Sequence, residues 1–195
     1  MASTEVVPEV LFVCTANICR SPMAEAILAG RLRDLGAQMR VGSTGLRAVG
    51  GPADEIAREV LATRGLDLSR HKSTGVTPRD IMDATLVLVM ERAHLIEIGT
   101  TVPGSWSRTF GLTEVVALGE RHGPRRADES IGEWLARLQV HRDPSGVLQA
   151  GTEFDIADPH GGTVAAYERC ADQLTRLIDA LVVLLCGTGA APGGQ

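Results

Sequence analysis

A short polar segment near the start of the chain carries the residue types needed for chemistry on a phosphate group. Cys14 is followed after five residues by Arg20, and Ser21-Pro22 comes next. A cysteine thiolate can attack phosphorus. The planar guanidinium of an arginine can hold two phosphate oxygens at once. Either residue alone is more often structural, but their spacing and context predict a nucleophile in a phosphate-binding loop.

The elements around this segment are those that such a loop requires. Residues 9–13 form a short apolar run typical of a buried strand. Ser21 suits the N-cap of a helix, and Pro22 suits its first position. The loop therefore enters a helix N-terminus, where free amides and the positive end of the helix dipole attract anions. The same positive potential favours the thiolate form of a cysteine.

Further strands and helices alternate along the chain, which indicates an α/β fold with a parallel sheet covered on both faces. The pattern predicts one domain over residues 1–187, with an insertion at about 121–153 and a flexible tail over 188–195. The expected helices are 22–35, 54–64, a short one with Thr77 as cap and Pro78 first, 91–98, 131–140 and 163–186, and the other expected strands are 39–43, 84–90 and 105–110.

Composition excludes several classes of function. The chain has 195 residues, a net charge of −5 and 3% aromatic residues, so neither a nucleic acid nor an anionic membrane is an expected partner. Residues 1–8 lack the basic segment of a secretory signal, and the apolar run 177–186 is too short to span a bilayer. We therefore expect a cytoplasmic protein.

Four cysteines are too few for a disulfide scaffold in a chain of this length. Cys170 and Cys186 lie in an apolar C-terminal stretch and are expected in the core. Cys14 and Cys19 have no second pair of cysteines to complete four zinc ligands, so no metal site is expected.

Residues 10–26 resemble the signature of the low-molecular-weight protein tyrosine phosphatases. The family also carries an Asp-Pro motif before its last helix, which Asp158-Pro159 matches. Ser43, His71 and Met90-Glu91 fall where the family has similar residues. The resemblance implies a three-layer α/β fold whose four-stranded parallel sheet has the order 2-1-3-4. It implies no cofactor.

The resemblance also implies roles for individual residues. Cys14 is the nucleophile that forms a phosphocysteine, Arg20 grips the phosphate, and Asp158 is the general acid and then the base. Ser21 donates to the departing Cys14 thiolate, and Asn17, Ser43 and His71 brace the loop. The residues expected to bind phosphate are Thr15, Ala16, Asn17, Ile18, Cys19, Arg20 and Ser21.

Cys19 corresponds to the second loop cysteine of the family. The resemblance implies a redox role, in which a reversible disulfide with Cys14 protects the nucleophile from further oxidation. The alternative is that Cys19 is a small residue that packs beneath the loop.

The chain departs from the family at several positions. Ala16 replaces the usual glycine, which would cost about 1 kcal/mol if that position requires positive φ. His160 replaces an aromatic residue after Asp-Pro, and residues 45–50 lack the family's Trp or Tyr. Ile18 stands where a phosphoarginine-selective branch has threonine, which makes that substrate less favoured.

The predicted function is a cysteine-dependent phosphomonoester hydrolase acting on phosphotyrosine in proteins, or on a small phosphomonoester. One alternative is an arsenate reductase that uses an external small thiol. The thioredoxin-coupled type needs further cysteines after the loop, and none lies between Cys19 and Cys170. A non-catalytic phosphate-binding regulatory module is the other alternative.

Overall fold

The computed structural model describes residues 9–149, 151 and 154–187. Its strands form a four-stranded parallel sheet in the order β2-β1-β3-β4, so the predicted fold class is confirmed. The elements are β1 (Glu9–Cys14), α1 (Arg20–Asp34), β2 (Arg40–Gly45), α2 (Glu55–Ala62), α3 (Pro78–Asp83), β3 (Leu86–Val89), α4 (Arg92–Thr101), the 3-10 helix η1 (Ser105–Ser107), β4 (Thr109–Gly111), α5 (Leu112–His122), α6 (Ile131–Gln139), α7 (Pro144–Gln149) and α8 (Val164–Cys186).

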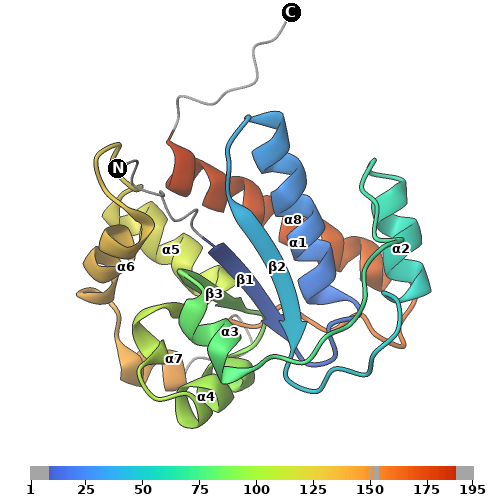
Figure 1. Ribbon diagram of the computed structural model, residues 1–195, viewed down its shortest axis with the longest axis horizontal. Coiled ribbons are helices and arrows are strands. Elements are labelled where there is room, and N and C mark those ends of the chain that lie inside the picture. The colour runs from blue at the N-terminus through green and yellow to red at the C-terminus, as the bar shows by residue number, and fades with distance from the viewer. Residues whose placement is uncertain (1–8, 150, 152–153, 188–195) are drawn as a thin grey trace, which may run out of the picture.

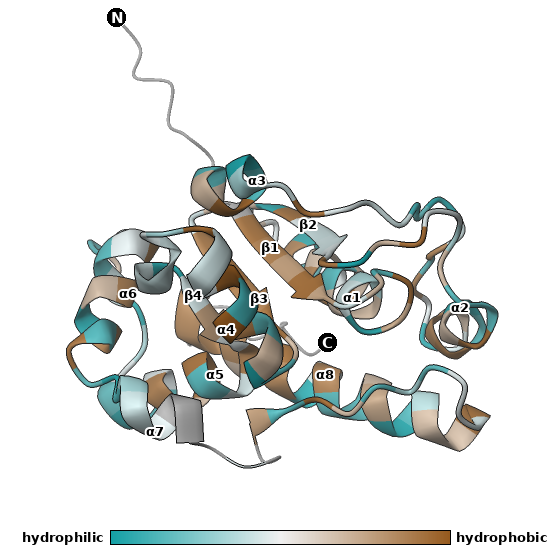
Figure 2. Cartoon of the chain, turned by 90° about the horizontal axis from the view of Figure 1, so that it is seen from below, coloured by the Kyte–Doolittle hydropathy of each residue, from teal (hydrophilic) through white to brown (hydrophobic). Residues whose placement is uncertain are grey.

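Helices cover both faces of the sheet, and successive strand residues point to opposite faces, so alternate residues enter two different cores. Val10 and Phe12 of β1 join a core with α1, α2, α5, α6 and α8, whereas Leu11 and Val13 join a second core with α3 and α4. Figure 1 shows α1 and α8 together beside the sheet. In Figure 2 the strands β1 and β3 are largely hydrophobic, while the helices alternate hydrophilic and hydrophobic residues.

Helix α8 contacts α1, α2 and α5 through one apolar face. Cys170 is buried on this face, as predicted, whereas Cys186 is only partly buried against the core. In the part of the chain that the structure describes, no helix is long and apolar enough to cross a membrane.

Several predicted boundaries are wrong. Helix α1 begins at Arg20 with Cys19 in the N-cap position, so Ser21 is not the cap. Residues 105–107 form a 3-10 turn, and the fourth strand is limited to Thr109–Gly111. Helices α5 and α7 were not predicted. Thr77 does cap α3 in a capping box with Asp80, as the Thr-Pro pair indicated.

Helix α6 confirms the helix predicted near residues 131–140, and the segment after it is anchored by a buried ion pair. The Arg142 guanidinium donates to both carboxylate oxygens of Glu114 on α5, at 2.6 and 2.9 Å, and lies over the rings of Trp106 and Phe110. That residues 121–153 are an insertion remains a prediction, and the predicted tail lies outside the described residues.

Candidate active site

The phosphate loop, residues 14–20, connects the carboxyl end of β1 to the start of α1. In open α/β sheets this edge is where ligands bind. Among the described residues other than glycine, only Asn17 has a positive φ, of 56°. Asparagine tolerates this conformation better than most residues. Ala16 does not have positive φ and therefore does not carry the conformational cost that alanine would have at such a position.

Two donors face the sulfur of Cys14. The backbone N–H of Asn17 donates to Sγ at 3.3 Å, and the Ser21 hydroxyl lies 2.9 Å from it. The side-chain amide of Asn17 donates to the same Ser21 oxygen at 2.9 Å. Because Ser21 accepts that bond, its own proton can point to the sulfur at 2.9 Å or to the more distant carbonyl of Thr44 at 3.4 Å. Both groups are thus within hydrogen-bonding distance of the Cys14 sulfur.

Asn17 is also the centre of a network that fixes the loop. Its Nδ2 donates to Ser43 Oγ at 2.9 Å, and Ser43 donates to Glu25 at 2.6 Å. Its Oδ1 accepts from the backbone of Thr74, and its backbone carbonyl accepts from Nε2 of His71 at 2.8 Å. The structure thus brings together Asn17, Ser43 and His71, the residues expected to brace the loop.

Arg20 is only 1% exposed and uses its guanidinium to join three segments. One nitrogen donates to Glu91 and to the carbonyl of Ile156, and the other donates to Oδ2 of Asp158 at 2.6 Å. Burial acts to lower the pKa of Arg20, but the hydrogen bond with Glu91 and the charges of Asp158 and Glu91 outweigh it and raise that pKa. The arginine is therefore a fixed cation.

Asp158 reaches the loop from a distant part of the sequence, just before α8. Its side chain is 44% exposed, and its Oδ1 accepts from the backbone N–H of His160 at 3.2 Å. Asp158 and the loop enclose a small cavity of about 130 Å³. The residues that line the cavity are Cys14, Thr15, Ala16, Ile18, Cys19, Arg20, Asp158 and His160.

This arrangement agrees with comparison to known families. The family model described as "Low molecular weight phosphotyrosine protein phosphatase" matches residues 9–123, more than half of the chain. The chain belongs to this family. It is therefore a low-molecular-weight phosphatase, and the resemblance drawn from its motifs is confirmed.

Relatives of this phosphatase are named either as tyrosine phosphatases or as arginine phosphatases. A probable low-molecular-weight protein-tyrosine-phosphatase, EpsP of Ralstonia nicotianae, is 32% identical over 89% of this chain and 92% of its own length. A protein-arginine-phosphatase of Geobacillus stearothermophilus is 32% identical over 88% and 92%. The solved tyrosine phosphatase of T. tengcongensis is 30% identical, with a TM-score of 0.68 over 90% of this chain and 97% of that one.

Two polar residues after β3 contribute to the phosphatase site in ways that were not predicted from the sequence. Glu91 resembles the family by its position in the sequence alone, yet in the structure it accepts a hydrogen bond from Arg20. His94 is buried, and its Nε2 lies 2.9 Å from Oγ1 of Thr15 in the phosphate loop. Burial lowers the pKa of His94, which favours the neutral ring. Their position directly after a central buried strand is the sequence signal that could have identified them.

Cys19 is a buried residue of the phosphate loop of the phosphatase. Its thiol donates to the hydroxyl of Tyr167 on α8, with 3.8 Å between sulfur and oxygen. Burial raises the pKa of the Cys19 thiol to about 12. Cys14 and Cys19 are both free thiols here. Cys19 is thus an uncharged packing residue in this state.

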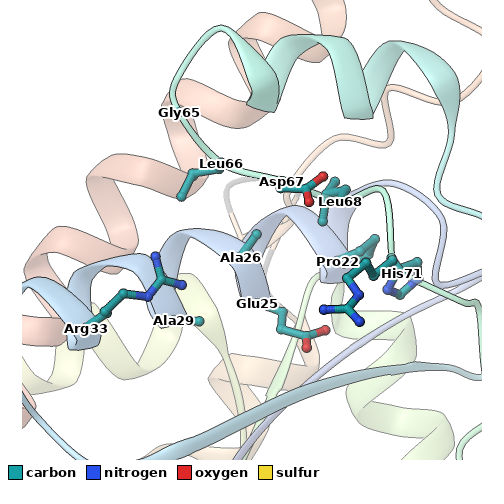
Figure 3. A pocket seen from close by; sticks show the side chains of 11 residues that line it. Pro22, Glu25, Ala26, Ala29, Arg33, Gly65, Leu66, Asp67, Leu68 and His71 are labelled. Carbon is teal, nitrogen blue, oxygen red and sulfur yellow. The ribbon is translucent and has the colours of Figure 1, made fainter.

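A larger groove of about 460 Å³ lies behind the bracing network of the phosphatase, between α1 and the chain that follows α2 (Figure 3). Glu25 and His71 line it, and both belong to the network around Asn17. The nucleophile does not line it, so this groove is separate from the cavity over Cys14.

Gly45 permits the close approach of β2 to the phosphate loop. A Cβ at this position would lie 2.8 Å from the carbonyl oxygen of Thr15 and 3.0 Å from the carbonyl carbon of Ala16. These are backbone atoms, so Gly45→Ala must displace the loop. A misplacement of about 1 Å can cost about 100-fold in rate. For a shift of a few tenths of an ångström, we expect kcat/KM for an aryl phosphate to fall about tenfold.

Gly42→Ala on the same strand is the matched control. Its Cβ would meet only Leu11, at an ordinary 3.8 Å, so turnover should stay near that of the native chain. Steady-state kinetics of the two variants decide the point, with circular dichroism to verify folding. Equal activity of Gly45→Ala and Gly42→Ala would show that the loop does not depend on this contact.

Proposed function

We propose that this phosphatase hydrolyses phosphotyrosine in proteins through a phosphocysteine intermediate on Cys14. The observation that carries the proposal is the convergence of Cys14, Arg20 and Asp158 around one small cavity. A nucleophile, a cation for the phosphate oxygens and a carboxyl group for the leaving oxygen are the groups that the reaction needs.

In the first step, the Cys14 thiolate attacks phosphorus and the bond to the tyrosyl oxygen breaks. Arg20 and the loop amides hold the equatorial oxygens, where transition-state charge is spread. Asp158 gives its proton to the leaving oxygen, which departs as a neutral phenol. Bound phosphate would take the place of Asp158 as the partner of Arg20, which releases the carboxyl group for this role.

In the second step, water attacks the phosphocysteine and the sulfur–phosphorus bond breaks. Asp158, now a carboxylate, accepts the proton of the water. Ser21 donates to the departing sulfur, since Asn17 already occupies the acceptor side of that hydroxyl. Inorganic phosphate and the thiolate are then restored.

The choice of phosphotyrosine over phosphoarginine rests on Ile18 at the rim of the cavity. Its partly exposed, β-branched apolar side chain suits contact with a phenyl ring. A threonine hydroxyl, which the phosphoarginine-selective branch has there, suits hydrogen bonding to a guanidinium. The relatives named for tyrosine and arginine substrates are equally similar, at 32% identity, and do not favour either.

Turnover of phosphotyrosine, phosphoarginine and phosphoserine peptides by the purified chain tests this proposal. We expect kcat/KM to be highest for phosphotyrosine. Ile18→Thr should lower the ratio of phosphotyrosine to phosphoarginine turnover, with Ile18→Val as the control that keeps an apolar branched side chain. A preference for phosphoarginine in the native chain would reassign the substrate without changing the mechanism.

That assay, together with a measurement of thiol consumption in the presence of arsenate, separates the two remaining functions. An arsenate reductase would consume an added small thiol only when arsenate is present, and a non-catalytic module would turn over no phosphate ester. We expect ester hydrolysis and no arsenate-dependent thiol consumption.

Mild peroxide is expected to inactivate the enzyme reversibly. Peroxide converts the Cys14 thiolate to a sulfenic acid, and attack by Cys19 then forms a disulfide and releases water. Because burial raises the pKa of Cys19 to about 12, the second step should be slow and compete with further oxidation. Mass spectrometry should show the loss of two hydrogens from the Cys14–Cys19 pair. Activity should recover with dithiothreitol in the native chain but not in Cys19→Ser. Finding Cys14 only as sulfinic or sulfonic acid would remove this role from Cys19.

A further inference from the structure

Three metal-binding side chains meet at the edge of the active-site cavity, although they come from separate parts of the sequence. Cys19 lies in the phosphate loop, Asp54 precedes α2, and His160 follows the Asp158-Pro159 turn. A sulfur of Cys19, an oxygen of Asp54 and a ring nitrogen of His160 all lie within 4.8 Å of one another. We infer that Cys19, Asp54 and His160 form a binding site for a divalent ion of the zinc type, which inhibits the phosphatase.

The donor set suits zinc. Thiolate, imidazole and carboxylate are its usual protein ligands, with bonds of about 2.0–2.3 Å in tetrahedral geometry. Such bonds place neighbouring donor atoms about 3.4–3.6 Å apart. Nδ1 of His160 already lies 3.4 Å from Oδ2 of Asp54. The His160 side chain is 59% exposed, so it can adjust its ring without disturbing the core.

The surrounding residues hold the two inner ligands in place. Oδ1 of Asp54 caps α2 by accepting from the amides of Ile56 and Ala57, which leaves Oδ2 directed toward His160. The Tyr167 hydroxyl accepts a hydrogen bond from the Cys19 thiol, and the nearby Asp54 carboxylate is one of the groups that raise the pKa of Tyr167. Hydrogen bonds of this kind to metal ligands orient them and tune their affinity.

Metal binding exchanges the thiol proton of Cys19 for the metal. The Cys19 thiol gives its proton to solvent as the sulfur–metal bond forms, and Asp54 and neutral His160 bind through lone pairs. A fourth position is left for water. No oxidation or reduction is involved.

A metal at this site would restrain the loop that carries the general acid. The backbone N–H of His160 donates to Asp158, and both His160 and Cys19 line the cavity over Cys14. An ion held between them narrows the cavity and fixes the Asp158 loop. It also occupies the Cys19 sulfur, so it blocks a disulfide with Cys14. The cysteine pattern in the sequence predicted no metal site, because it lacks a second cysteine pair. This site instead combines one cysteine with ligands that only the fold brings together.

Spectroscopic titration with Co²⁺, followed by displacement with Zn²⁺, tests the site independently of substrate and activity. The full chain with Cys14→Ser is used, because Cys14 would otherwise supply a competing thiolate. We expect one Co²⁺ per chain, with a thiolate-to-cobalt charge-transfer band and the intense visible bands of tetrahedral cobalt. Adding Cys19→Ser should abolish the charge-transfer band, although Cys170 and Cys186 remain.

His160→Ala, in the same Cys14→Ser background, should weaken metal binding by more than about 100-fold, since even the loss of a second-shell partner costs about 10–100-fold. The matched control is His141→Ala, because His141 is an exposed histidine that stacks on His122 away from this cluster. That change should leave the titration unaltered. A charge-transfer band that survives Cys19→Ser, unchanged affinity in His160→Ala, or no binding at all would each overturn the proposal.

Inhibition of the native chain supplies the functional arm. Zn²⁺ should inhibit turnover, a chelator should restore it, and His160→Ala should raise the half-inhibitory Zn²⁺ concentration relative to His141→Ala. Each variant is compared with its own metal-free rate. Equal sensitivity of the two histidine variants would show that zinc inhibits elsewhere, and would overturn the inhibitory role.

Discussion

Replacing Cys14 by serine is expected to abolish phosphatase turnover while phosphate binding persists. The sulfur supplies the attacking electron pair, whereas Arg20 and the loop amides supply the grip on the phosphate oxygens. Loss of a covalent nucleophile costs at least about 10⁴-fold in kcat in well-studied hydrolases, and we expect a loss of that size here. Aryl phosphate hydrolysis measures the first effect, and calorimetric titration with inorganic phosphate measures the second.

Cys14→Ala is the stricter companion variant, because alanine has no hydroxyl that could attack. Cys170→Ser is the matched control, since Cys170 is buried in α8 and does not line the cavity. We expect the control to retain turnover. Native-like activity in both Cys14 variants would eliminate the covalent mechanism, and loss of phosphate binding in both would show that the sulfur is needed to shape the loop.

The fold was predictable because its strongest signals are local. The strands β1 and β3 are buried on both faces, and their residues form continuous apolar runs in the sequence, as in other parallel strands. Helix α5 was missed because it follows β4 with no intervening loop. Its buried residues Leu112, Val115, Val116 and Gly119 have helical spacing, which would have identified it.

The sequence predicted only those site residues that lie in a recognisable motif or at the position where the family has one. Cys14 and Arg20 lie in one short segment, and Asp158 has the Asp-Pro context. The contact of Glu91 with Arg20 and the proximity of His160 to Cys19 depend on the packing of separate segments. No local pattern in the sequence records such distances.

Asp158 is the residue whose role joins the architecture to the mechanism. Asp158 lies in the segment before α8, which passes along the same edge of the sheet as the phosphate loop after β1. Only the fold brings the two together. Glu91 and Asp155 do not line the cavity over Cys14, whereas Asp158 does. Glu91 bonds to Arg20, and Asp155 accepts from the backbone of Arg92 at 2.7 Å. Glu153 lies outside the described residues. Asp158 is therefore the carboxyl group we expect to serve the leaving oxygen.

Asp158→Asn should cost most where the leaving oxygen most needs a proton. With phenyl or tyrosyl phosphate, we expect the rate to fall about 10²–10⁴-fold, the usual range for a positioned general acid. A nitrophenyl phosphate leaves as a stabler anion and should lose less, so the dependence of rate on leaving-group pKa becomes steeper. The alkaline limb of the pH profile should also flatten, because it reports loss of the acid's proton. The measurement is kcat/KM across a series of substituted phenyl phosphates, for the native chain and for Asp158→Asn. Asp155→Asn is the matched control; it should affect all leaving groups equally if Asp155 only caps α4.

If Asp158→Asn also affects every leaving group equally, Asp158 is a turn residue, since asparagine satisfies turns as well, and the general acid must be sought among Glu91, Glu153 and Asp155.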